Sequence, residues 1–237
     1  MSDPGSVALL VGAITVATNA IYLAIRGDHL RKQYPQAGLP SSLSLVWASL
    51  LLGTLPLWMG SHLDPSPGSL GDPSWGIGVV GVLSSVVTLG WLSLLIDARS
   101  RKLPSELTSL MAFEIFVSWF ITLINVGFRI DGVLAPALGA LLWLVPSFIG
   151  ARTGQIGRGD VRLAPVLGFG LGTMSLMASV LGLLLAYLFA GIAALSLRRH
   201  GATIGHRFAL GPFLYVGTWS SFAIGCLVPM LAPLTHG

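Results

Sequence analysis

The chain has 237 residues, of which 54% are hydrophobic and only 9% are charged. Soluble domains carry about 25% charged residues, and a core of this length cannot hide so many apolar side chains from water. The composition excludes an ordinary soluble domain and predicts an integral membrane protein. The net charge of +4 does not indicate a nucleic-acid partner, because basic residues of membrane proteins collect in cytoplasmic loops.

Apolar stretches long enough to cross a bilayer, which takes about 20 residues, follow one another along the chain. They are predicted at residues 7–25, 41–60, 76–96, 107–127, 133–150 and 208–232. The stretch 164–197 would form a helix of about 51 Å, too long for a hydrocarbon core of about 30 Å. We expect it to divide near Gly170–Thr173 into a short helix, 161–172, and a full one, 174–197.

The predicted fold class is therefore all-α, a polytopic membrane helix bundle of about eight transmembrane helices, one of them short or partial. We expect residues 1–237 to form a single membrane-embedded domain. In this topology 12 of the 13 Lys and Arg residues lie in loops on one face, and Arg129 is the exception. That bias indicates the cytoplasmic face.

The metal-binding residue types give no sign of a metal site. Cys226 is the one cysteine, which excludes an internal disulfide and a CxxC zinc site. The five histidines fall in predicted loops or the tail, without the spacing of ligands. We expect no metal and no other cofactor.

Two aspartates fall at the same predicted membrane edge on different helices: Asp97 (GWLSLLIDARSRKLP) and Asp160 (GRGDVRL). Two carboxylates that meet cannot easily both stay ionised, so one can activate water while the other protonates a leaving group. Gly157 and Gly159 permit unusual backbone angles and leave room for another chain beside Asp160. The alternative is an N-cap aspartate at 160, with Asp97 as a charge at a helix end.

Two glutamates belong to the fourth predicted span or its start. Glu106 follows Pro104 and Ser105 at a helix start, where a capping role is expected. Glu114 lies within the span, and an acid inside a membrane is by default a functional candidate. A hydrogen-bonded packing residue facing the bundle is the equal alternative for Glu114.

Three motifs together resemble the type IV prepilin peptidases, a family of GxGD-type membrane aspartyl peptidases. GRGDVRL matches the GxGD signature, DARSRKLPSELT looks like the first-aspartate motif, and HRFALGPFLYVG resembles the stretch that opens the last helix. The likeness runs from residue 97 to about 216. It implies that Asp97 and Asp160 are a catalytic pair that removes a short basic leader from type IV prepilins or pseudopilins.

The resemblance also implies where the enzyme works and what surrounds its site. It places the protein in the cytoplasmic (inner) membrane of a prokaryote, with the active site at the cytoplasmic side. The expected partners are a prepilin or pseudopilin substrate helix and membrane lipid. Site-shaping roles fall to five residues: Gly157, Gly159, Pro104, Gly211 and Pro212. Arg162, where the family usually has lysine, and Glu114 are accessory candidates.

The chain departs from the long family members, which carry a zinc-binding insert with paired CxxC motifs and also N-methylate the mature pilin. Here the loop 26–40 is short and has no cysteine, which identifies a short form without an expected methyltransferase activity. Two alternatives remain. One is another GxGD intramembrane protease with a non-pilin substrate. The other is a transporter using intramembrane carboxylates, disfavoured because two acids share one edge and no repeat is visible.

Overall fold

The computed structural model describes residues 4–62, 73–128, 130–154, 156–199 and 209–231. Within these residues the chain forms eight α-helices and one short 3-10 helix, and no strand. The predicted all-α fold class is confirmed. Arg129 and the predicted start of the last span at residue 208 lie outside the described residues.

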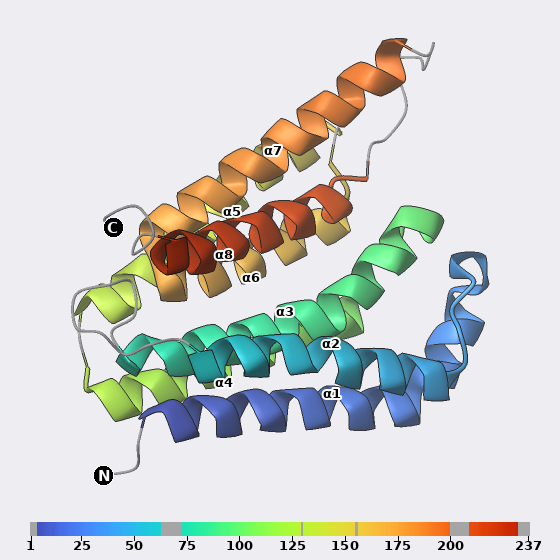
Figure 1. Ribbon diagram of the computed structural model, residues 1–237. Helices are drawn as coiled ribbons and strands as arrows, with labels where there is room; N and C mark the ends of the chain where they lie inside the picture. Colours follow the sequence, from blue (N-terminus) through green and yellow to red (C-terminus); the bar gives the residue numbers. More distant parts are fainter. Residues whose placement is uncertain (1–3, 63–72, 129, 155, 200–208, 232–237) are drawn as a thin grey trace. The chain divides into compact units, whose positions relative to one another are not determined.

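The chain divides into two compact units, residues 1–130 and 131–237, and each is described by itself. Unit 1 holds α1 (Pro4–Gln33), η1 (Pro35–Ala37), α2 (Ser42–His62), α3 (Pro73–Ser100) and α4 (Ser105–Val126). In this unit α1 packs against α2 and α3, and α3 packs against α4 (Figure 1). The single peptidase domain over residues 1–237 stays a prediction.

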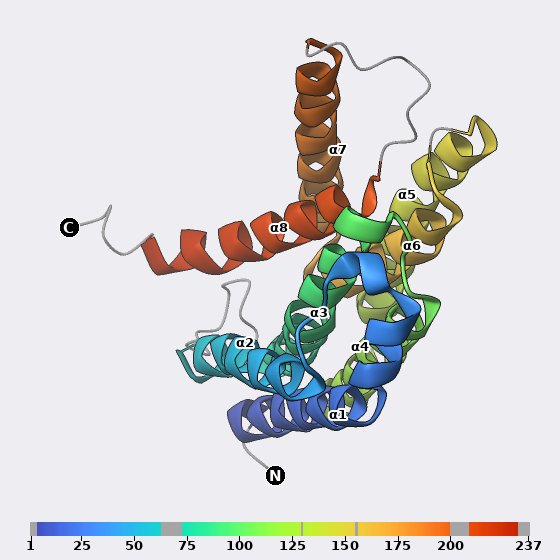
Figure 2. The same cartoon turned by 90° about the vertical axis from the view of Figure 1, so that its right-hand side faces the viewer.

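Unit 2 is built from the four helices in the second half of the chain. They are α5 (Ile130–Arg152), α6 (Arg158–Met174), α7 (Leu176–Arg199) and α8 (Gly211–Leu231). The last helix, α8, packs against both α6 and α7, and Figure 2 shows α7 and α8 crossing.

Five described helices are long and apolar enough to cross a membrane. These candidate spans are Ser6–Gln33, Val79–Ser100, Ser105–Asn125, Gly132–Arg152 and Leu176–Ser196. Large apolar side chains point outward, such as Ile25 at 72% exposed and Met177 at 74%, while Asn19 is fully buried. Exposing such an apolar surface to water is unfavourable, whereas lipid tails solvate it. In lipid, polar groups are favoured inside the protein. The helices therefore indicate a multi-pass membrane protein.

The predicted division of the long apolar stretch is confirmed, a little later than expected. Helix α6 ends at Met174 and α7 begins at Leu176, with Ser175 extended between them at φ −169° and ψ 155°. The hydroxyl of Ser175 accepts a hydrogen bond from the Ala178 N–H at 3.0 Å, which caps the start of α7. The serine, more than the preceding glycines, fixes where the second helix begins.

The glycines of the GFGLG stretch (168–172) serve close helix packing. A Cβ at Gly172 would lie 2.6 Å from the Ala135 carbonyl oxygen, and one at Gly168 would lie 2.7 Å from Cγ of Trp143. Helix α6 therefore approaches α5 more closely than larger residues would allow. With 17 residues, α6 is about 26 Å long, short of a full crossing as predicted.

The first helix extends beyond the predicted span of residues 7–25. Helix α1 continues to Gln33, so the expected loop from Arg26 was wrong. Charged residues end an apolar stretch but do not end a helix, and RGDHLRKQ holds no proline. The helix stops shortly before Pro35, whose ring cannot continue it. Helix α3 likewise runs past its predicted end at residue 96 to Ser100.

Candidate active site

Asp97 lies on α3, one turn before the end of that helix, and is only 4% exposed. Its carbonyl oxygen accepts the N–H of Arg101 at 2.8 Å. Arg101 has a φ of 54°, a left-handed backbone that a non-glycine residue adopts at some cost, and it turns the chain away from α3. The helix, and not a loop, therefore fixes the position of Asp97.

Pro104 stands at the start of α4, as its locked φ predicts. It is the N-cap residue, with φ −65° and ψ 116°, and its side chain is buried. Its carbonyl oxygen accepts the N–H of Thr108 at 3.2 Å. Only Arg101 to Leu103 separate α3 from this cap, so the connection that follows Asp97 is short and held at both ends.

Asp160 is the third residue of α6, and it is 4% exposed. The N-cap is Gly157, with no side-chain cap, so the N-cap alternative for Asp160 is wrong. The Asp160 carboxylate instead accepts hydrogen bonds from the backbone N–H groups of Gly157, Leu210 and Gly211. The GxGD stretch and the start of α8, about 50 positions apart in the sequence, meet in unit 2 at this carboxylate.

Two opposing effects set the pKa of Asp160, which precedes the apolar part of α6 and lies outside the candidate spans. Burial is the larger effect and raises the pKa to about 6, since the charged form loses its hydration. The three backbone N–H groups act in the opposite direction, because they stabilise the carboxylate. The group is therefore poised to gain or lose a proton close to neutral pH.

The glycines of the GxGD motif are near the surface. Gly157 is exposed and Gly159 is half-buried. A Cβ at Gly157 would lie 3.4 Å from Oδ2 of Asp160, so a larger side chain there would cover part of the carboxylate. This geometry is compatible with the expected clearance for a substrate chain. The site-shaping role of the two glycines stays a prediction.

The remaining predicted site residues differ in their surroundings. Gly211 is the first residue of α8 and touches Asp160 through its N–H. Pro212 follows it, half-buried, in the first helical turn, where a missing N–H does no harm. Arg162 is exposed.

The structure places the two aspartates in different units. Asp97 belongs to unit 1 and Asp160 to unit 2. Both are buried and both lie within one turn of a helix end. Their pairing stays a prediction.

Glu106 and Glu114 are both on α4 but have different partners. Glu106 does not cap the helix; it accepts hydrogen bonds from Arg26 at 3.0 Å and from the Tyr22 hydroxyl at 3.1 Å. The capping expectation was wrong, because an arginine from α1 reaches the same carboxylate. Glu114 is buried and accepts a hydrogen bond from Ser85 at 2.7 Å.

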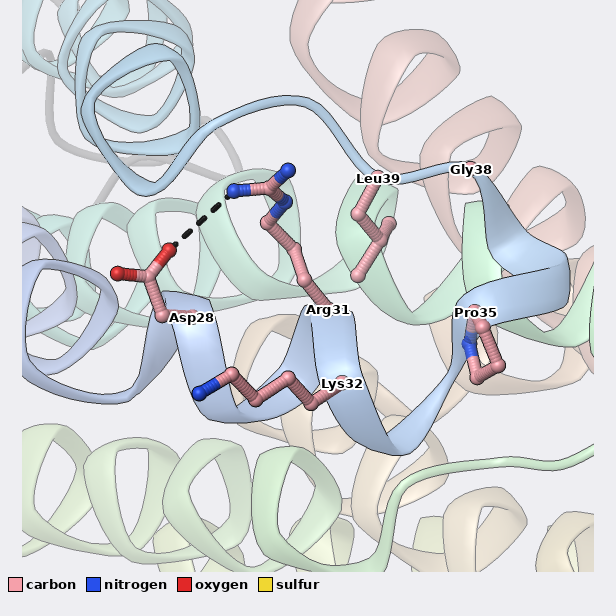
Figure 3. A pocket seen from close by; sticks show the side chains of 6 residues that line it. All are labelled: Asp28, Arg31, Lys32, Pro35, Gly38 and Leu39. Carbon is pink, nitrogen blue, oxygen red and sulfur yellow. Dashed lines mark hydrogen bonds and ion pairs between the residues drawn. The ribbon is translucent and has the colours of Figure 1, made fainter.

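A surface pocket of about 530 Å³ lies in unit 1, where α1 meets the turn that follows it. Six residues line it: Asp28, Arg31, Lys32, Pro35, Gly38 and Leu39. Figure 3 shows Arg31 directed toward Asp28, its ion-pair partner at 3.4 Å, and the Lys32 side chain outside that pair. The pocket holds two cationic side chains and one acid that is already paired, so it would not bind a basic peptide well. None of the predicted catalytic residues lines it.

Sequence reasoning missed two kinds of contributor. Leu210 acts through its N–H, which no side-chain pattern reveals. Asn19 bonds to Glu114 from 95 positions away, although an asparagine within an apolar span was a visible signal. In the described part of the chain no group of three or more His, Cys, Asp or Glu side chains could hold a metal ion.

The sequence model of the type IV leader peptidase family matches residues 84–195. This match confirms the family resemblance that the motifs predict, and it supports a type IV leader peptidase-like protease in general. The matched segment includes Asp97, Pro104, Glu114 and the GxGD motif but ends before Gly211. No curated protein and no solved structure matches the chain.

Proposed function

From the premise that residues 84–195 match the type IV leader peptidase family, we propose that this chain is a membrane aspartyl endopeptidase. It removes the short basic leader from type IV prepilin-like or pseudopilin substrates at the cytoplasmic face of a prokaryotic inner membrane. One observation carries the proposal. Asp97 and Asp160, two acids of the matched segment near helix ends, are each only 4% exposed, which is unusual for aspartate.

The proposed reaction is hydrolysis by two carboxyl groups that share a proton. The ionised aspartate takes a proton from water as the water oxygen bonds to the scissile carbonyl carbon. The protonated aspartate gives its proton to the leaving nitrogen as the carbon–nitrogen bond breaks. The leader departs with a new carboxyl group and the mature chain with a new amine, and no cofactor enters.

The surroundings of Asp160 support this role. Its backbone donors stabilise the ionised form while burial favours the protonated form, so the group can exist in either state during a cycle. Gly157 is exposed and has no side chain to cover Oδ2 of Asp160. A substrate backbone can therefore approach the carboxylate at this point. Substrate and lipid are the partners of this proposal.

Leader removal is the one activity proposed. Residues 26–33 continue α1 and residues 35–37 form a single 3-10 turn. Cys226, the one cysteine of the chain, is far from this segment in the sequence, so the paired cysteines of the long family members are absent here. We expect the mature N-terminus to leave the enzyme unmethylated.

The test is co-expression with a candidate prepilin, followed on a gel for leader removal and by mass spectrometry of the mature N-terminus. Asp97→Asn and Asp160→Asn should each abolish the shift while the protein still accumulates in the membrane. Asp28→Asn is the matched control, since Asp28 is an exposed acid paired with Arg31, and it should process normally.

Continued processing by either aspartate variant would overturn the two-acid mechanism. If none of several prepilins is cleaved and a non-pilin membrane substrate is cleaved instead, the result would favour the alternative of another GxGD intramembrane protease. A mature N-terminus heavier by one methyl group would contradict the single activity.

A further inference from the structure

A polar cluster inside unit 1 joins α1, α3 and α4 around Glu114. Glu114 is 6% exposed, and Asn19 and Thr88 are fully buried, as is Ser85. The cluster lies within the candidate spans of all three helices. A charged carboxylate buried in such surroundings costs much free energy unless a cation pairs with it.

Both hydrogen bonds that the Glu114 side chain accepts reach the same carboxylate oxygen. Oε2 accepts from the Ser85 hydroxyl at 2.7 Å and from Nδ2 of Asn19 at 3.2 Å. The same Asn19 amide donates to the Thr88 hydroxyl at 2.6 Å. Thr88 in turn donates to the Ser84 carbonyl, so its oxygen is free to accept from Asn19.

Glu114 and Asn19 each have one further side-chain oxygen, and neither oxygen has a hydrogen-bond partner. Within the described residues, Oε1 of Glu114 and Oδ1 of Asn19 are both buried and unpaired. No ion pair to Glu114 is found there; the glutamate of α4 that does pair with a cation is Glu106, two turns earlier, which binds Arg26 of α1. Two unpaired acceptors on adjacent groups are costly, and one hydrogen between them would satisfy both.

We propose that Glu114 is a proton-binding site: Oε1 carries a proton and donates it to Oδ1 of Asn19. A carboxylic acid and a primary amide can form two hydrogen bonds side by side, one in each direction. The resulting neutral pair holds α1 and α4 together, and Ser85 and Thr88 attach it to α3. A hard metal cation instead requires about six or more oxygen ligands, and two unpaired oxygens do not supply them. This site does not depend on the proposed peptidase function.

Infrared spectroscopy of the full chain in lipid nanodiscs at pH 7.5 tests the protonation directly. The wild-type spectrum minus that of Glu114→Gln should contain the C=O stretch of a protonated carboxylic acid. Glu106→Gln is the matched control, because Glu106 is the arginine-paired glutamate of the same helix; it should lose carboxylate bands and keep the acid band. Loss of carboxylate bands in Glu114→Gln would overturn the proposal.

Thermal unfolding distinguishes a proton from a metal ion as the ligand. Glutamine imitates a protonated glutamate, so Glu114→Gln should melt within about 4 °C of wild type, while Glu114→Ala should fall by more than that. Equal losses in both variants would overturn the proposal. So would a melting temperature that rises with sodium over choline chloride in wild type but not in Glu114→Gln.

Discussion

The carboxylate of Asp160 is unusual because its burial and its hydrogen bonds act in opposite directions. Burial favours the protonated acid, whereas the N–H groups of Gly157, Leu210 and Gly211 favour the ion. Burial is the larger effect and leaves the pKa at about 6. The hydrolytic role proposed for Asp160 needs both protonation states within reach near neutral pH, which this balance provides.

The raised pKa of Asp160 predicts a pH-dependent stability. A native pKa of about 6 against 3.8 means that the folded state binds the proton more tightly. The stabilisation is complete below about pH 4 and is lost as the pH rises to about 6, a change of about 3 kcal/mol at 1.36 kcal/mol per unit. An asparagine side chain does not titrate, so Asp160→Asn should gain stability relative to wild type between these pH values.

Thermal unfolding in detergent at pH 4 and pH 7 measures this difference. The melting temperature of Asp160→Asn minus that of wild type should be larger at pH 7. Asp28→Asn, which changes an exposed acid, serves as the control. A difference for Asp160→Asn that does not vary with pH would show that the carboxyl titrates alike in both states.

The backbone N–H of Gly211 can be removed with little other change. Gly211 is the first residue of α8, a position that tolerates proline. A hydrogen bond to a charged group contributes about 1.5–3 kcal/mol, so Gly211→Pro should raise the pKa of Asp160 further and slow leader cleavage about 10- to 100-fold. Gly211→Ala keeps the N–H and should stay close to wild type. Equal rates in the two variants would exclude this N–H from the site.

At the scale of the helices, the sequence predicts each described α-helix but not its ends. Runs of apolar residues predict all eight helices because lipid leaves no other way to satisfy the backbone. Their ends depend on signals outside that rule. Arg26 to Gln33 are polar but still helical, and the capping hydroxyl of Ser175 lies inside an otherwise apolar stretch.

The packing of α6 on α5 predicts contrasting effects for two glycines of unit 2. A Cβ at Gly168 would meet the Gly139 carbonyl and Trp143, whereas one at Gly191 would meet nothing within 4 Å. Gly168→Ala should destabilise by about 1–3 kcal/mol through overpacking. Gly191→Ala, within α7, should stabilise by about 0.4–1 kcal/mol. Melting temperatures in detergent check both, and a neutral Gly168→Ala would mean that α5 and α6 separate freely.

For the whole molecule, the sequence singles out the candidate site residues but not the groups that contact them. The GxGD glycines and both aspartates stand out because acids are rare in this chain, with nine Asp and Glu in 237 residues. The resemblance gave Gly211 a place near the site, but it could not predict that the N–H groups of Leu210 and Gly211 donate to Asp160, since these bonds come from backbone atoms distant in the sequence. The same holds for the bond between Asn19 and Glu114, which depends on how α1 rotates against α4.

The distribution of basic residues predicts which loops face the cytoplasm. In a Cys226→Ser background, Phe128→Cys should react with an impermeant maleimide in intact spheroplasts. Thr153→Cys should react only after the membrane is opened. Both positions are exposed and lie between helices, so accessibility alone does not distinguish them. The reverse labelling pattern would invert the predicted topology and place the proposed active site on the outer face.

The hydrogen bonds from Leu210 and Gly211 to Asp160 have a consequence for how this protein can vary during evolution. A main-chain donor is supplied by every amino acid except proline. Position 210 can therefore exchange its side chain, within the limits of packing, without losing that bond. Related chains can differ there while keeping the bond, and an alanine scan would leave the bond intact. Neither a comparison of sequences nor an alanine scan would therefore detect this contributor to the site. Only its position in the structure reveals it.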